Sequence, residues 1–160
     1  MKFEQVDWQD ERAIALRAAM DAESAATYAE VITAQSPEKR EAMSLAFVVN
    51  PIEIVDCVLA IDDDDGVAGH AALRPWHNEL EVKKVFVPTA ARGRGVARVL
   101  MTELERLAAA RGIHSLVLQT GHLQLAAIRL YESLGYERIE AFRGYAVVPA
   151  ALCFRKILTP

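Results

Sequence analysis

The stretch Leu80–Ala97, with the sequence LEVKKVFVPTAARGRGVA, decides the fold of this chain of 160 residues. Its first part, Leu80–Val87, is rich in β-branched and aromatic residues and predicts a strand. Its last part, Arg92–Ala97, is a turn of arginine and glycine, and the apolar spacing from Val96 onward predicts a helix. The first turn of a helix has unpaired N–H groups and the positive end of the helix dipole, glycine lets a ligand approach the backbone, and arginine adds charge. The stretch therefore predicts a turn that binds pyrophosphate.

The alternation of apolar and polar residues breaks in the middle of the predicted strand. Leu80 and Val82 place the apolar face on even positions, whereas Val85–Val87 is apolar throughout. A β-bulge produces such a break, and so does a strand that is buried on both faces at one end. The pattern leaves both interpretations open. A bulge would free backbone N–H and C=O groups for a ligand.

Similar patterns predict the other elements of the chain. Asp65-Gly66 is a strong hairpin signal, and Ser36-Pro37 is a typical start of a helix. The strand–helix–strand core implies parallel pairing and the hairpins imply antiparallel pairing, so we expect one domain over residues 1–160 with a mixed sheet. The predicted helices cover residues 10–29, 37–47, 96–111 and 124–134, the predicted strands cover residues 2–7, 52–61, 67–73, 80–87, 113–119, 136–139 and 152–158, and residues 74–78 form a loop.

The composition is that of a soluble globular protein, and the distribution of charge favours a small anionic ligand. Hydrophobic residues make up 52% and the formal net charge is -4, which disfavours a general nucleic-acid surface. Arg92, Arg94 and Arg98 form a local basic group in an acidic chain. Cys57 and Cys153 are too few for a disulfide framework, so we expect reduced thiols. Because we find neither a signal peptide nor an apolar segment long enough for a membrane, we expect a cytoplasmic protein that binds no membrane.

We expect no metal site. The run Asp62–Asp65 lacks the spaced ligands and the closing glutamate of a calcium loop, and it is more typical of a solvated hairpin tip. The four histidines have no mutual metal-ligand spacing.

Three features together resemble the GCN5-related N-acetyltransferase (GNAT) superfamily. The strand Glu81–Val87 followed by Arg92–Ala97 is similar to the pyrophosphate loop of that family, whose pattern is (Gln/Arg)-x-x-Gly-x-(Gly/Ala). Leu118–Gly121 and then Gln124–Tyr136 are similar to its second cofactor segment. The order of the elements also agrees. The resemblance implies an α/β (α+β mixed) fold: a mostly antiparallel twisted sheet of about six to seven strands, flanked by about four helices, with a splayed and bulged central strand.

The resemblance also implies acetyl-CoA as the cosubstrate. The backbone of Val85 and Val87 would pair with the pantetheine arm like an added strand, and the amides of Arg94–Ala97 would hold the pyrophosphate. Gln124 stands where the family has a polar contact to the cofactor. The implied cofactor-binding residues are Val85, Phe86, Val87, Arg92, Gly93, Arg94, Gly95, Val96, Ala97, Gln124 and Tyr131.

Acetyl transfer to an amine needs a base, an acid for the leaving thiolate, and donors for the carbonyl oxygen, because a free alkylamine has a pKa near 10. Glu81 is the candidate general base, acting through a water; the alternative is a solvated or lysine-paired strand carboxylate. Tyr131 matches the family tyrosine that donates to the coenzyme A sulfur; the alternative is ordinary packing. The N–H of Val85 is the candidate oxyanion donor.

The acceptor is the least determined part of the prediction. Glu23 and Tyr28 near the end of the first helix, Trp76 in a loop and Tyr145 late in the chain are candidate substrate-binding residues. We expect an N-acetyltransferase that acts on a primary amine of a small or amino-acid-like molecule in a ternary complex, as a monomer or homodimer. A peptide or protein N-acetyltransferase and a non-catalytic acyl-CoA sensor remain alternatives.

Overall fold

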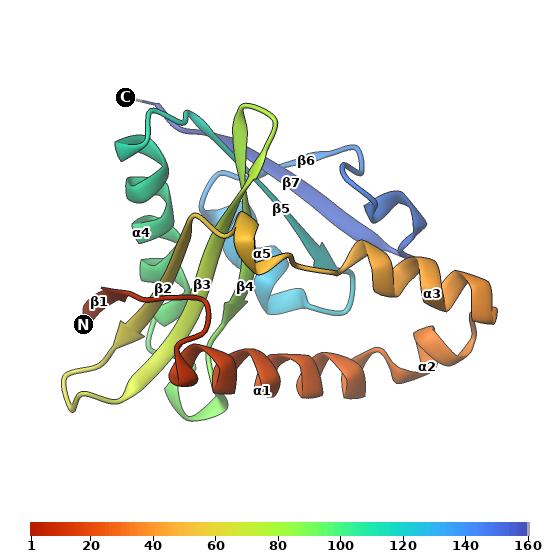
Figure 1. Ribbon diagram of the computed structural model, residues 1–160, viewed down its shortest axis with the longest axis horizontal. Helices are drawn as coiled ribbons and strands as arrows, with labels where there is room; N and C mark the ends of the chain where they lie inside the picture. The colour runs from red at the N-terminus through yellow and green to blue at the C-terminus, as the bar shows by residue number, and fades with distance from the viewer. Residues whose placement is uncertain (160) are drawn as a thin grey trace.

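A sheet of seven strands forms the centre of the protein in the computed structural model, which describes residues 1–159 (Figure 1). The strand order across the sheet is β1-β2-β3-β4-β5-β7-β6. Every neighbouring pair is antiparallel except β4 and β5, which are parallel, so the sheet is mixed and mostly antiparallel as predicted. The strands are β1 (Lys2–Gln5), β2 (Asp56–Ile61), β3 (Val67–Trp76), β4 (Glu79–Phe86), β5 (Ser115–Gly121), β6 (Glu137–Ile139) and β7 (Ala151–Ile157).

Helices cover both faces of the sheet. The face with α4 and α5 takes the even residues of β2, such as Val58, while the face with α1 takes the odd ones, such as Leu59. Side chains of α3 and of a late 3₁₀ turn pack on the second face near β5 and β7. The α-helices in residues 1–159 are α1 (Glu11–Thr27), α2 (Ala29–Thr33), α3 (Pro37–Ala46), α4 (Val96–Ala110) and α5 (Leu125–Ser133), and α2 is a short helix that the sequence did not predict.

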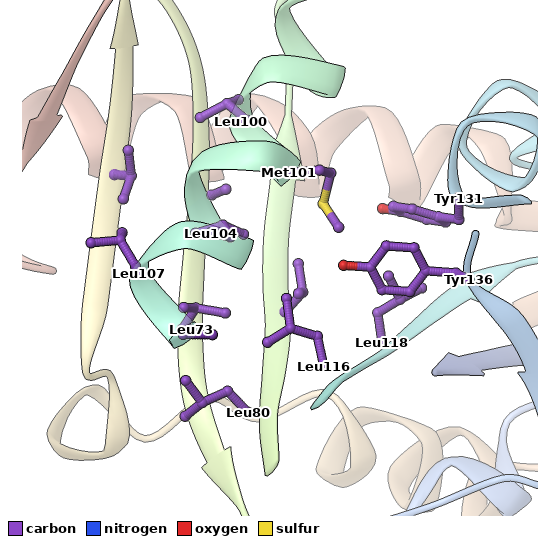
Figure 2. Close-up of a cluster of buried hydrophobic side chains, with 14 of the residues drawn as sticks. Leu73, Leu80, Leu100, Met101, Leu104, Leu107, Leu116, Leu118, Tyr131 and Tyr136 are labelled. Atoms are coloured by element: carbon purple, nitrogen blue, oxygen red, sulfur yellow. The ribbon is translucent and has the colours of Figure 1, made fainter. Parts of the chain in front are cut away.

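The largest part of the core lies between α4 and the sheet (Figure 2). Leu100, Met101 and Leu104 recur at helical spacing and are fully buried against the strands. Tyr131 and Tyr136 extend this cluster toward α5, with their ring centres 6.0 Å apart. Burying this stripe fixes α4 on the sheet, and so it also fixes the turn that precedes the helix.

Two boundaries differ from the sequence prediction by more than two residues. The loop expected at residues 74–78 is wrong, because β3 continues to Trp76 and pairs with β4, leaving a turn of His77 and Asn78. Pro75 lies opposite Leu80 in this pairing. The strand expected from residue 52 begins only at Asp56, because Pro51–Glu53 forms a 3₁₀ turn whose N-terminus is capped by a side chain.

The central strand β4 contains a β-bulge, which is one of the two interpretations of its sequence pattern. His70 pairs with Phe86 and Ala72 pairs with Lys83, so β4 has one more residue than β3 between the two pairs. Lys84 adopts a φ of 54°, which is uncommon for a residue other than glycine. Pairing of β4 with β5 stops at Val82, and Figure 1 shows the two strands running apart beyond their paired ends.

Candidate active site

The predicted pyrophosphate turn lies between the end of β4 and the start of α4. Gly93 and Gly95 have φ values of 75° and 77°, a backbone conformation that favours glycine. Gly95 is the N-cap of α4, and no side chain caps the first turn of the helix. The N-terminus of α4 therefore presents N–H groups that can donate hydrogen bonds to a bound anion.

The arginines of this turn contact acidic side chains. Arg92 Nη2 donates to Glu23 at 2.8 Å, and Arg92 Nε donates to the carbonyl of Val87 at 3.0 Å. Arg94 Nη1 lies 3.5 Å from an Asp62 oxygen. Both arginines remain about half exposed, with 45% and 51% of their side-chain surface accessible. They are thus available to a ligand at the turn.

A buried histidine holds the bulge of β4. The ring nitrogen Nδ1 of His70 lies 2.8 Å from the carbonyl oxygen of Lys84, and this contact is a hydrogen bond when Nδ1 carries the proton. The other ring nitrogen faces Arg17 Nη1 and Cys57 Sγ, both at 3.3 Å. Burial lowers the pKa of His70 to about 4, so the ring is neutral at physiological pH. No sequence pattern assigns this role to His70, because its partner is a backbone carbonyl.

Glu81 lies at the centre of a buried ionic cluster on the face of the sheet opposite α4. Its side chain is fully buried, and one carboxylate oxygen accepts from Arg74 Nε at 2.7 Å. The other accepts a hydrogen bond from the Tyr145 hydroxyl and lies 3.6 Å from Lys83 Nζ. Arg143 Nε lies 2.8 Å from the first oxygen, although its N–H forms no hydrogen bond there. Lys83 Nζ also donates to the Tyr145 oxygen at 2.8 Å, so the cluster is continuous.

Burial and charge act against each other in this cluster. Burial raises the pKa of Glu81, but Lys83, Arg74 and Tyr145 outweigh burial and hold that pKa below its usual value. Burial lowers the pKa of Lys83 to about 8 despite the nearby carboxylate. Burial and the negative charge of Glu81 raise the pKa of Tyr145, so its hydroxyl stays protonated. The cluster therefore holds an ionised carboxylate beside an amine that can lose its proton near neutral pH.

Tyr131 lies on the opposite side of the sheet, on α5. Its ring packs against Tyr136 and Phe154, and burial alone raises its pKa to about 12. Its hydroxyl is therefore a proton donor at neutral pH. Gln124 is half-buried at the N-cap of the same helix, and its backbone N–H donates to the carbonyl of Gly121.

The predicted acceptor residues do not form one group. Glu23 pairs with Arg92, and Tyr145 belongs to the Glu81 cluster. The hydroxyl of Tyr28 accepts from the backbone N–H of Leu123 at 3.2 Å, at the start of the turn into α5. Trp76 packs on Phe142, and the Arg143 guanidinium lies over its ring at 4.6 Å.

A cavity adjoins the Glu81 cluster. It has a volume of about 540 Å³, which suits a small molecule. Arg74 and Arg143 line it together with Asn50 and Glu53, and apolar side chains of α3 form another wall. The cavity and the Glu81 cluster therefore share two arginines.

The family model for the acetyltransferase (GNAT) family matches residues 15–136. The chain belongs to this family. The match includes the bulged strand, the turn at Arg92–Ala97 and the segment up to Tyr136.

Curated relatives of this GNAT protein match over part of their length. An IAA acetyltransferase of Azospirillum brasilense is 33% identical over 106 residues, which is 66% of this chain and 61% of the relative. A streptothricin acetyltransferase of Streptomyces lavendulae is 31% identical over 80 residues, or 49% of this chain and 42% of the relative. An N-acetylaspartate synthetase of Danio rerio is 31% identical, with 27% of its length covered. The chain thus matches less than two thirds of each relative.

Solved structures match over nearly the whole chain. A Klebsiella pneumoniae protein assigned as an acyl-CoA N-acyltransferase has 26% identity and a TM-score of 0.78, with 99% of this chain and 97% of that chain covered. A PaiA N-acetyltransferase of Thermoplasma acidophilum in complex with coenzyme A has a TM-score of 0.68 at 15% identity, with 98% and 99% covered. The second comparison shows the shared fold.

The GNAT site contains residues that the sequence analysis missed. Arg74, Lys83 and Arg143 surround Glu81, and His70 holds the bulge. The alternation along β4 could have placed Lys83 on the face of Glu81, since the two residues are two positions apart before the bulge. Within residues 1–159 no three His, Cys, Asp or Glu side chains gather as a metal site, and no helix there is long and apolar enough to cross a membrane.

Proposed function

We propose that this GNAT protein transfers the acetyl group of acetyl-CoA to a primary amine of a small, amino-acid-like molecule by direct attack in a ternary complex. Residues 1–160 would act as one catalytic domain. The streptothricin acetyltransferase among the relatives supports a small-molecule acceptor.

The separation of β4 and β5 is the observation that carries this proposal. Beyond Val82, β4 has no partner on its β5 side, so its backbone can pair with an extended chain there. The turn at Arg92–Ala97 follows directly, and its helix N-terminus suits a pyrophosphate. An extended arm that ends in a pyrophosphate is the shape of acetyl-CoA, and an Elizabethkingia anophelis protein of this fold binds that compound.

The cofactor-binding residues follow from this placement. Val85, Phe86 and Val87 would supply the backbone for the pantetheine arm, and Gln124 and Tyr131 would contact it from the side of α5. Arg92 and Arg94 would add charge to the amides of Gly93, Gly95, Val96 and Ala97 at the pyrophosphate. The N–H of Val85, next to the bulge, would stabilise the carbonyl oxygen in the transition state.

Glu81 would act as the general base through a water or through its buried neighbours. The amine nitrogen attacks the thioester carbon, the C–N bond forms, the C–S bond breaks, and the amine loses a proton. Because Glu81 is fully buried, that proton needs a path. Lys83 donates a hydrogen bond to Tyr145 and Tyr145 donates one to Glu81, so the side chains of Lys83 and Tyr145 provide a path for the proton. A pKa of about 8 suits Lys83 as a proton acceptor.

Tyr131 would protonate the leaving thiolate, since its hydroxyl is protonated at neutral pH. Tyr131→Phe removes that donor and is expected to lower kcat roughly 100-fold, with the KM for acetyl-CoA little changed. Tyr136→Phe is the matched control, because the Tyr136 hydroxyl bonds to Glu105 in the same core cluster. Release of free thiol from acetyl-CoA measures both.

The assay should include amino acids, polyamines, aminoglycosides and short peptides as acceptors. Thiol release that depends on a small amine and falls in Tyr131→Phe supports the proposal. Release with peptides alone favours a peptide N-acetyltransferase. Stabilisation by acetyl-CoA without any thiol release favours a sensor. The absence of both stabilisation and thiol release refutes the acetyl-CoA assignment.

We also propose a cytoplasmic monomer or homodimer that binds neither nucleic acid nor a membrane.

A further inference from the structure

We propose that the acceptor amine carries a carboxylate, which Arg143 and Arg74 bind in the cavity beside Glu81. This inference rests on the proposed function and names the class of its acceptor. It predicts a preference for α-amino acids and similar anionic amines over polyamines and aminoglycosides.

The acidic residues that would attract a cationic amine are already paired. Asp21 accepts from Lys84 Nζ at 2.6 Å, and Glu23 accepts from Arg92 at 2.8 Å. Both carboxylates lie on α1 and are held toward the bulge and the pyrophosphate turn. Neither carboxylate is among the residues that line the cavity.

The lining of the cavity is net positive, because it includes Arg74 and Arg143 but only one acidic residue, Glu53. Arg74, Lys83 and Arg143 all lie within 4 Å of the single buried carboxylate of Glu81. Glu53 lies 3.8 Å from Arg74, but 45% of its side chain is exposed to water. A surplus of buried positive charge is costly, and an anionic ligand relieves that cost. The same cations disfavour a bound ammonium ion, which promotes the neutral amine that attack requires.

Both arginines have N–H groups that form no hydrogen bond within the protein. Arg74 uses one N–H toward Glu81, one toward the carbonyl of Val48 and one toward Tyr145, which leaves two of the five N–H groups of a guanidinium. Arg143 donates to the carbonyl of Pro75 from Nη2. Its guanidinium lies over the Trp76 ring, and 21% of its side chain is exposed. A carboxylate that enters the cavity thus meets a guanidinium that is held in place and reaches the surface.

The other walls of the cavity are apolar. Leu45 and Ala46 of α3 line it together with Val48 and Val147. A ligand that fits both parts has a carboxylate at one end and an apolar side chain. Apolar α-amino acids such as leucine and phenylalanine are therefore the acceptors to test first.

The test measures how fast the wild-type protein acetylates two sets of matched amines. The first set is leucine, leucinamide and isoamylamine, and the second is phenylalanine, phenylalaninamide and phenethylamine. The carboxamide has the less basic amine, so amine chemistry alone would favour the amide. We expect kcat/KM to be at least roughly tenfold higher for the acid. Arg143→Gln should remove that preference mainly through KM, and Arg143→Lys should retain part of it. Arg40→Gln, on the exposed side of α3, is the charge-matched control. Melting temperatures establish that each variant is folded.

The outcomes separate this inference from the proposed function. If amides or simple amines are acetylated as well as the acids, the carboxylate site is refuted and the acetyltransferase stands. If no amine is acetylated, the proposed function fails, and calorimetric titration of leucine and leucinamide then decides the binding claim. Binding of leucine alone, lost in Arg143→Gln, supports the carboxylate site, while equal binding or none overturns it.

Discussion

Glu81→Gln is the substitution that tests the buried ionic cluster most directly. Glutamine keeps the shape of the side chain and removes its charge, while Arg74, Lys83 and Arg143 stay in place. Breaking a buried ion pair by removing one partner costs about 3–5 kcal/mol. For a chain of this size, about 1 kcal/mol corresponds to roughly 2–4 °C in Tm, so we expect Tm to fall by about 6–20 °C.

The assay is urea unfolding followed by circular dichroism, with a double-mutant cycle. Lys83→Met in the Glu81→Gln background removes one of the unmatched cations, so the double variant should be less destabilised than the sum of the single variants by about 1–3 kcal/mol. The Arg40→Gln variant should unfold like the wild type. A loss below about 1 kcal/mol for Glu81→Gln, together with additive single variants, would refute the reasoning that these charges depend on one another.

Three further predictions concern the residues around the split between β4 and β5. His70→Leu leaves the Lys84 carbonyl without its donor and should raise the KM for acetyl-CoA about tenfold, whereas His70→Asn keeps a donor there and should stay near the wild type. The pKa of His70 is lowered from 6.5 to about 4, so the folded protein binds fewer protons than the unfolded chain between these values. The stability of the wild type should therefore fall more steeply from pH 6.5 to pH 4 than that of His70→Asn, and an equal pH dependence would contradict this. Gly121→Ala would place a Cβ 1.9 Å from the Tyr28 hydroxyl oxygen, so Tm should drop, and Tyr28→Ala added to it should restore part of the loss. An unchanged Tm in Gly121→Ala would show that the Tyr28 ring moves aside at little cost, which contradicts this prediction.

Local patterns predicted the elements of Leu80–Ala97 better than they predicted the surroundings of Glu81. The strand, the glycine turn and α4 are continuous in sequence, so periodicity and turn chemistry place them together. Arg74 was assigned to a loop, although β3 continues through Arg74 and Pro75 to Trp76. Arg143 and Tyr145 reach Glu81 from a segment more than sixty residues later in the chain, and only tertiary packing brings them there. His70 depends on strand register, which a single residue type does not reveal.

The bulge at Lys84 is also a border within one strand. Before it, β4 contributes side chains, Glu81 and Lys83, to the region assigned to the amine; after it, the strand contributes mainly main-chain groups to the region assigned to the donor. Side chains mutate and main-chain amides do not. On the proposed function, a substitution before Lys84 therefore alters the chemistry at the amine while the main-chain contacts to acetyl-CoA are retained, and an engineer seeking a new acceptor should vary the cavity walls and leave Glu81 and Lys83 in place.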